Sequence, residues 1–163
     1  MISNFNKELY ECLDLLHEDY RGKCDIHIFY SKFDYIKWII KNKFIGMKPA
    51  GKVLRGHSLG CYTSHDTVDT KILHIYVFNH KFEDRYLKQC VLHTLLHELR
   101  HCYQHTRNTK YWNMKHTYKV TDDEYSEAPI EKDANKFAKR MMIKHSDEFS
   151  RILNVYPDWE FNR

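Results

Sequence analysis

This sequence of 163 residues has only three prolines and five glycines, the residues that are common in linkers between domains. It also contains no internal repeat and no low-complexity run. Linkers between domains are usually rich in such residues, and the length is close to the common size of one domain. We therefore expect residues 1–163 to form a single domain with its own hydrophobic core.

Long apolar runs are also missing, because no segment approaches the roughly 18 apolar residues that a membrane-spanning helix needs. The N-terminal stretch MISNFNKELYE lacks the apolar region of a secretory signal. The five cysteines are odd in number and form no Cys-x-x-Cys pair, which is typical of reduced thiols. We expect a cytoplasmic protein that has no membrane partner.

A strong excess of one charge is missing as well. Lysine plus arginine number 26 and aspartate plus glutamate number 22, so the formal net charge is +4. This small excess does not favour nucleic-acid binding and does not exclude it. The hydrophobic share of 42% and the aromatic share of 15% predict a folded globular protein rather than a disordered chain.

The hydrophobic pattern predicts an α+β fold, with a small mixed or antiparallel sheet packed on a long central helix. The predicted elements, in chain order, are a helix-strand-helix unit (1–50), a sheet (51–80), the central helix (82–105) and an amphipathic helix (129–145). Residues 71–78 are the clearest strand, and they could offer a free edge to an extended peptide. The central helix is apolar over most of its circumference, which predicts that it is buried.

The central helix contains His97-Glu98-Leu99-Arg100-His101, which matches the H-E-x-x-H pattern of zinc peptidases. Two histidines four residues apart lie on one face of a helix, so both imidazoles can bind one zinc ion. Glu98 is offset around the helix and can reach a water beside the metal without binding the metal itself. This arrangement predicts Glu98 as the general base that activates the attacking water.

His93 and His105 extend this pair into a stripe of histidines at four-residue spacing. His97 is the member of the stripe with a glutamate after it and a histidine four residues on. We therefore assign the metal to His97 and His101. His93 and His105 are expected to support the site or to line its rim.

A catalytic zinc site usually has a third protein ligand. The elongated pattern H-E-x-x-H-x-x-G-x-x-H is excluded, because Gln104 and Arg107 stand where it requires glycine and histidine. Glu131 is the preferred ligand, since it borders the apolar face of the next predicted helix, and Glu127 stays open as the alternative. Asn135, one turn after Glu131, could orient a histidine.

The segment between the two helices contributes candidates for transition-state stabilisation. Their side chains could donate hydrogen bonds to the oxyanion that develops during hydrolysis. These candidates are His116, Tyr118 and Tyr125.

The segment from His97 to His101, followed by Glu131-Lys-Asp-Ala-Asn-Lys-Phe-Ala138, resembles the small bacterial and phage zincins of the ImmA/IrrE family. The resemblance covers about residues 70–145. It implies a zincin core, zinc-dependent peptidase activity and Glu131 as third ligand. Family members often have glycine before the second histidine, where this chain has Arg100. The SprT-like proteases, which act on DNA-bound proteins, are a more distant resemblance.

Taken alone, the sequence predicts a zinc metalloendopeptidase of the glutamate-ligand class, with one Zn²⁺ and a protein or peptide substrate. The alternative is a noncatalytic metal-binding or protein-interaction module on the same scaffold, such as a phage or host regulatory protein. Glu98 favours the enzyme, because a noncatalytic scaffold does not need it. Neither a substrate sequence nor an oligomeric state is predicted.

Overall fold

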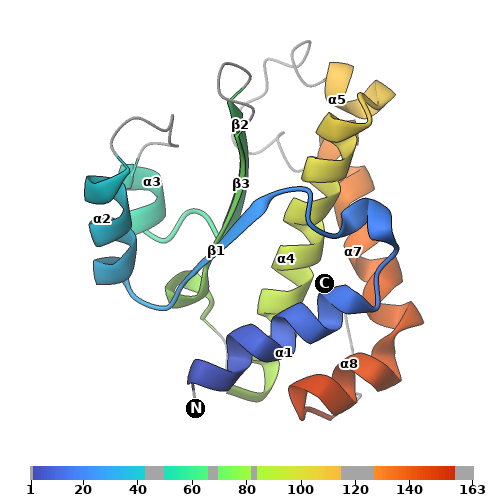
Figure 1. The fold of residues 1–163 in the computed structure, drawn as a ribbon, viewed down its shortest axis with the longest axis horizontal. Helices are drawn as coiled ribbons and strands as arrows, with labels where there is room; N and C mark the ends of the chain where they lie inside the picture. Colours follow the sequence, from blue (N-terminus) through green and yellow to red (C-terminus); the bar gives the residue numbers. More distant parts are fainter. Residues whose placement is uncertain (1, 43–49, 66–69, 82–83, 115–126, 157–163) are drawn as a thin grey trace.

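Helices surround a three-stranded sheet in a mixed α+β arrangement (Figure 1). The structure is a computed structural model that describes residues 2–42, 50–65, 70–81, 84–114 and 127–156. In chain order the elements are α1 (Ile2–Asp14), the 3₁₀ turn η1 (Glu18–Tyr20), β1 (Asp25–Phe29), α2 (Lys32–Lys41), α3 (Ala50–Leu54), β2 (Gly60–His65), β3 (Thr70–Tyr76), the 3₁₀ turn η2 (Val77–Asn79), α4 (Asp84–Thr106), α5 (Lys110–Met114), α7 (Pro129–Lys144) and α8 (Ser146–Leu153).

The sheet has the strand order β1-β3-β2, with β3 in the centre. β3 is parallel to β1 and antiparallel to β2, and Tyr62 of β2 lies opposite Leu73. The prediction that residues 71–78 offer a free edge is therefore wrong, because strands pair with both sides of β3. Within the described residues, β2 has β3 as its one neighbour in the sheet and forms the edge.

Alternate residues of β3 belong to different parts of the core, as the two-residue repeat of a strand requires. Leu73 and Ile75 pack in the larger core cluster with the leucines of α4. Tyr76 packs in a second cluster with Phe29 and Tyr35. Burial on both faces explains why β3 reads as a nearly continuous apolar run.

The long helix α4 packs against β2 and β3 and also against α7, as Figure 1 shows for the two helices. α7 starts at Pro129, where the missing backbone N–H of proline costs no helical hydrogen bond. Ala134 and Ala138 are fully buried on α7, and their small side chains allow a close approach to α4. Residues on this face of α7 therefore lie beside the histidines of α4.

Several predicted boundaries need correction. Residues 50–54 form the helix α3 instead of β structure, and Val53 of this helix is buried in the second core cluster. The predicted sheet region therefore starts only at Gly60. The strand predicted at 71–78 ends at Tyr76, where η2 begins. Part of the segment between the helices predicted at 82–105 and 129–145 also forms a helix, α5.

The α+β prediction is confirmed, and the thiol prediction agrees with the structure. All five cysteines are free thiols, and three of them are buried. Among the helices of the described ranges, none combines the length and apolarity that crossing a bilayer requires.

Candidate metal centre

Three side chains from α4 and α7 meet with their ligand atoms facing one another. The Nε2 atoms of His97 and His101 are 3.0 Å apart. Glu131 Oε2 lies 3.1 Å from His97 Nε2, and Glu131 Oε1 lies 3.3 Å from His101 Nε2. Among the described residues, these three form a group whose possible ligand atoms all lie within 4.8 Å of one another.

The spacing of these atoms fits a tetrahedral metal ion. Donors bonded to zinc at about 2.0–2.2 Å in tetrahedral geometry lie about 3.3 Å from each other. The separation of 3.0 Å between the two Nε2 atoms, and those of 3.1 and 3.3 Å from them to the two carboxylate oxygens of Glu131, are close to that value. Two imidazole nitrogens and one carboxylate oxygen are also a ligand set that zinc accepts.

The Nδ1 atoms of the two histidines form hydrogen bonds outside the cluster, which leaves their Nε2 atoms available to a metal. Nδ1 of His101 lies 2.8 Å from Gln104 Oε1, and Nδ1 of His97 lies 2.9 Å from Asn135 Oδ1. An amide oxygen accepts a hydrogen bond, so each Nδ1 donates and each Nε2 faces the cluster. Two imidazole nitrogens and a carboxylate thus converge, which is an arrangement that suits a cation.

Burial and neighbouring charges shift the pKa values of His101 and His93. Burial lowers the pKa of His101, but the hydrogen bond to Glu131 and the charges of Glu98 and Glu131 outweigh it and raise the pKa above its ordinary value. His93 lies outside this cluster, and burial together with the charge of His97 lowers its pKa to about 4. His93 is therefore neutral at pH 7, which agrees with a supporting place on the helix.

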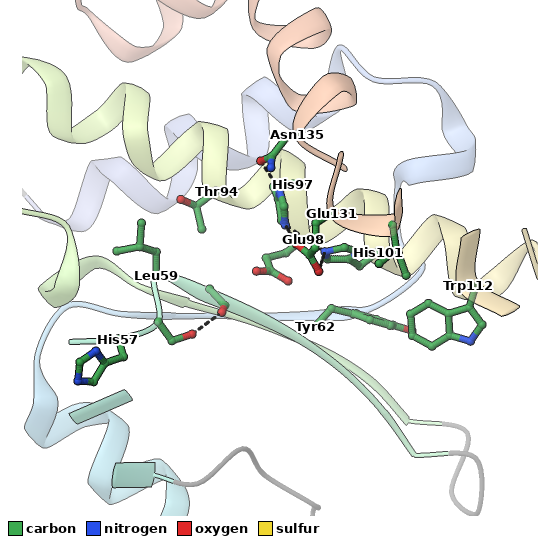
Figure 2. A pocket seen from close by; sticks show the side chains of 13 residues that line it. His57, Leu59, Tyr62, Thr94, His97, Glu98, His101, Trp112, Glu131 and Asn135 are labelled. Atoms are coloured by element: carbon green, nitrogen blue, oxygen red, sulfur yellow. Dashed lines mark hydrogen bonds and ion pairs between the residues drawn. The ribbon is translucent and has the colours of Figure 1, made fainter. Parts of the chain in front are cut away.

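The cluster opens into a pocket of about 350 Å³ that lies between α4, α7 and β2 (Figure 2). Glu98 lines this pocket and is buried, and Figure 2 shows its carboxylate directed into the same space as Glu131. The neighbouring stretch from His57 to Gly60 and the side chain of Tyr62 form another wall. A proton acceptor and three possible metal ligands thus share one accessible space.

Gly60 marks a close approach between the edge strand and α4. A Cβ atom at this position would lie 2.8 Å from Thr94 Cγ2 and 2.9 Å from Glu98 Cγ. Carbon atoms do not pack at such distances, so only glycine fits there without a shift of its neighbours. The absence of a side chain at Gly60 allows β2 to lie against Glu98.

Changing Gly60→Ala is expected to destabilise the protein by about 1–3 kcal/mol, since the added methyl group overpacks a tight contact. It should also slow any reaction that depends on Glu98, because that side chain is the one displaced. Urea unfolding measures the first effect and a peptidase assay the second. Gly51→Ala is the control, because its added Cβ meets only the Arg55 guanidinium at 3.6 Å or more. Equal stability of Gly60→Ala and wild type would contradict the close contact.

The last histidine of the stripe belongs to an aromatic group at one end of the pocket. His105 Nδ1 lies 2.8 Å from the Tyr62 hydroxyl, and its ring packs at 4.5 Å from that of Trp112. Tyr62 and Trp112 both line the pocket (Figure 2). His105 therefore lies at the rim, as the sequence analysis expected, and supports an aromatic wall that it did not anticipate.

The two candidates for the third ligand differ in burial and in their contacts. Glu131 is buried beside both histidines, whereas Glu127 is exposed and forms an ion pair of 2.7 Å with Lys132. Glu127 is not part of the cluster. The remaining candidates, His116, Tyr118 and Tyr125, lie outside the described residues.

Arg100, which departs from the glycine of the ImmA/IrrE family, has a defined place. It donates hydrogen bonds to Asp133 of α7 from Nε at 2.7 Å and from a terminal nitrogen at 3.3 Å. Partial burial raises the pKa of Asp133, but hydrogen bonds from Arg100 and Gln104 outweigh it and hold the pKa below its ordinary value. The sequence analysis missed Gln104 as a contact of His101. The one signal was its position, three residues after His101 on the same helix.

Comparison with known proteins gives one match. The sequence model of the family described as "Protein of unknown function (DUF3920)" matches residues 67–149. That range includes β3, α4 and α7, and with them every residue of the cluster. No curated protein and no solved structure matches the chain.

Proposed function

The chain belongs to the DUF3920 family, and we propose that it is a zinc-dependent metallopeptidase with His97, His101 and Glu131 as ligands. The observation that carries this proposal is the shared pocket. Three metal-binding side chains at zinc-like spacing and the carboxylate of Glu98 surround one accessible space. A noncatalytic metal site has no need for a carboxylate directed at such a space.

The three ligands, Glu98 and two amide side chains each have a role in this proposed hydrolysis. A zinc ion held by the three ligands would supply Lewis-acid activation of the attacking water and of the scissile carbonyl. Glu98 takes the proton of the water as it attacks, and delivers that proton to the departing amine. Asn135 and Gln104 hold the two imidazoles, because their amide oxygens accept the Nδ1 protons.

The edge strand supports a peptide as the substrate. β2 lies beside the pocket, and Gly60 and Tyr62 of this strand line it. An extended peptide can add to the edge of a sheet through main-chain hydrogen bonds that do not depend on its sequence. A peptide aligned with β2 would pass the ligand cluster, which brings one of its carbonyl groups to Glu98.

The charge of the pocket favours cleavage within a chain over removal of a C-terminal residue. Recognition of a terminal carboxylate calls for a lysine or an arginine at the site. Among the described residues that line the pocket, none is a lysine or an arginine. β2 also runs along one side of the pocket, where a bound chain would extend along the strand past the ligand cluster. The proposal is therefore an endopeptidase.

The test starts from the metal content of the purified protein, measured by elemental analysis, and continues with hydrolysis of a fluorescently labelled unfolded protein. About one zinc per chain, and cleavage that a chelator abolishes and added zinc restores, is the expected result. Zinc without cleavage of any unfolded substrate would favour the noncatalytic metal-binding module. Absence of stoichiometric metal after incubation with zinc would reject both metal-dependent functions.

A further inference from the structure

Gln104 is the most deeply buried polar side chain near the candidate ligands, with an exposed fraction of 0%. It lies one turn after His101 on α4. Its Oε1 is 2.8 Å from His101 Nδ1, and its Nε2 is 3.1 Å from the backbone oxygen of Ile130 on α7. The same Nε2 is 2.8 Å from Asp133 Oδ2. The amide thus connects a ligand on one helix with two acceptors on the other.

These contacts allow only one orientation of the amide. The backbone oxygen of Ile130 can only accept a hydrogen bond, so the NH₂ group of Gln104 must face α7. The amide oxygen must then face His101, and it can only accept. His101 therefore donates from Nδ1, which leaves Nε2 as the ring nitrogen that faces Glu131 and His97.

Asp133, one of the two acceptors for Gln104, is itself held in place by other contacts. Arg100 binds Asp133 with two nitrogens and donates to the hydroxyl of Tyr20 at 2.7 Å. Its guanidinium lies over the ring of Tyr103, 4.8 Å from the centroid. Asp133 is therefore held by contacts that do not involve Gln104, and the side chains that make this network come from three separate segments of the chain.

His97 lacks a comparable arrangement. Its Nδ1 contacts Asn135, which lies at the surface, so water can replace this amide if it is removed. His101 and Gln104 are both buried, and no water reaches their hydrogen bond without displacing protein atoms. The two histidines of the pair thus depend on their neighbours to different degrees.

We propose that Gln104 is a positioning residue that holds His101 in the tautomer and orientation needed to bind the metal, and that Asp133 and Arg100 hold Gln104. This inference rests on the proposed function, because it concerns the same metal site. It explains why this chain has glutamine at 104 and arginine at 100, where the elongated zincin pattern and the ImmA/IrrE pattern have glycine.

The experiment compares Gln104→Met with Gln89→Met, by titrating each variant with zinc in competition with a chromophoric chelator. Gln89 is the matched control, since it is also a buried glutamine of α4 and donates to a backbone oxygen, that of Tyr156, at 3.1 Å. Both variants lose a buried hydrogen bond and should melt at lower temperature without metal. Only Gln104→Met should bind zinc about 10–100-fold more weakly than wild type.

A second variant keeps the test decisive if Gln104→Met does not fold. Asp133→Asn preserves the shape of its side chain and weakens the hold on Gln104, so zinc affinity should fall here as well, by a smaller factor. Zinc affinities equal to wild type in the folded variants would overturn the role of Gln104 and leave the metal site intact. A wild type that binds no zinc would instead reject the proposed function, and this inference with it.

Discussion

Replacing Glu98 with glutamine is expected to leave zinc bound and to slow peptide hydrolysis by about 10²–10⁴-fold, the usual contribution of a general base. Glutamine has the shape of glutamate, so the packing of this buried side chain against Gly60 should persist. It cannot take a proton from water at neutral pH. Steady-state kinetics and elemental analysis on the same preparation separate the two effects, because kcat should fall while zinc stays near one per chain.

Glu127→Gln provides the matched control for this substitution. It removes the same charge from an exposed carboxylate that pairs with Lys132 and lies outside the ligand cluster. Its kinetics and metal content should equal those of wild type. Unchanged kcat in Glu98→Gln would show that another group takes the proton. Loss of zinc in Glu98→Gln would instead make Glu98 a ligand.

The part of the candidate site that could be predicted is the part that helical geometry determines locally. His97 and His101 are four residues apart, so they share a face of any straight helix. Glu131 and Asn135 have the same spacing on the next helix, and both point to α4. The prediction needed only one further assumption, that the two amphipathic helices pack through these faces.

Other features depend on contacts between distant segments, which spacing does not reveal. Gly60 is required because β2 approaches Glu98, 38 positions later in the chain. The position of β3 in the centre of the sheet depends on pairing with β1, which is far away in the sequence. A strand with a buried pattern on both faces signals a central position, and this signal in residues 71–78 contradicted the free edge that we predicted there.

A single helix, α7, supplies most of what surrounds the two histidines. Glu131 contacts both Nε2 atoms, Asn135 contacts the Nδ1 atom of His97, and Asp133 binds the glutamine behind His101. These three residues follow one another at intervals of two positions and reach different parts of the site. The packing of α7 against α4 therefore completes the site, and we expect substitutions in α7 to weaken metal binding more than they disturb the sheet.

The strongest effect on metal binding is expected from Glu131→Ala. This change removes the one carboxylate of the cluster and leaves two histidines, which is fewer than the three protein ligands typical of a catalytic zinc site. Zinc content should fall from about one per chain to near zero after passage over a chelating resin. Added zinc at about 100 times its Kd should stabilise wild type by about 2.7 kcal/mol, and should leave the unfolding of Glu131→Ala unchanged.

Glu127→Ala decides between the two ligands that the sequence left open. Because Glu127 is exposed, forms only a surface ion pair and lies outside the cluster, its removal should keep both zinc and the stabilisation by zinc. The reverse result, with zinc lost in Glu127→Ala and kept in Glu131→Ala, would mean that the segment before Pro129 rearranges to bring Glu127 to the histidines. In that case the contacts of Glu131 with His97 and His101 would be ion pairs of the metal-free protein, and α7 would have to move when the metal binds.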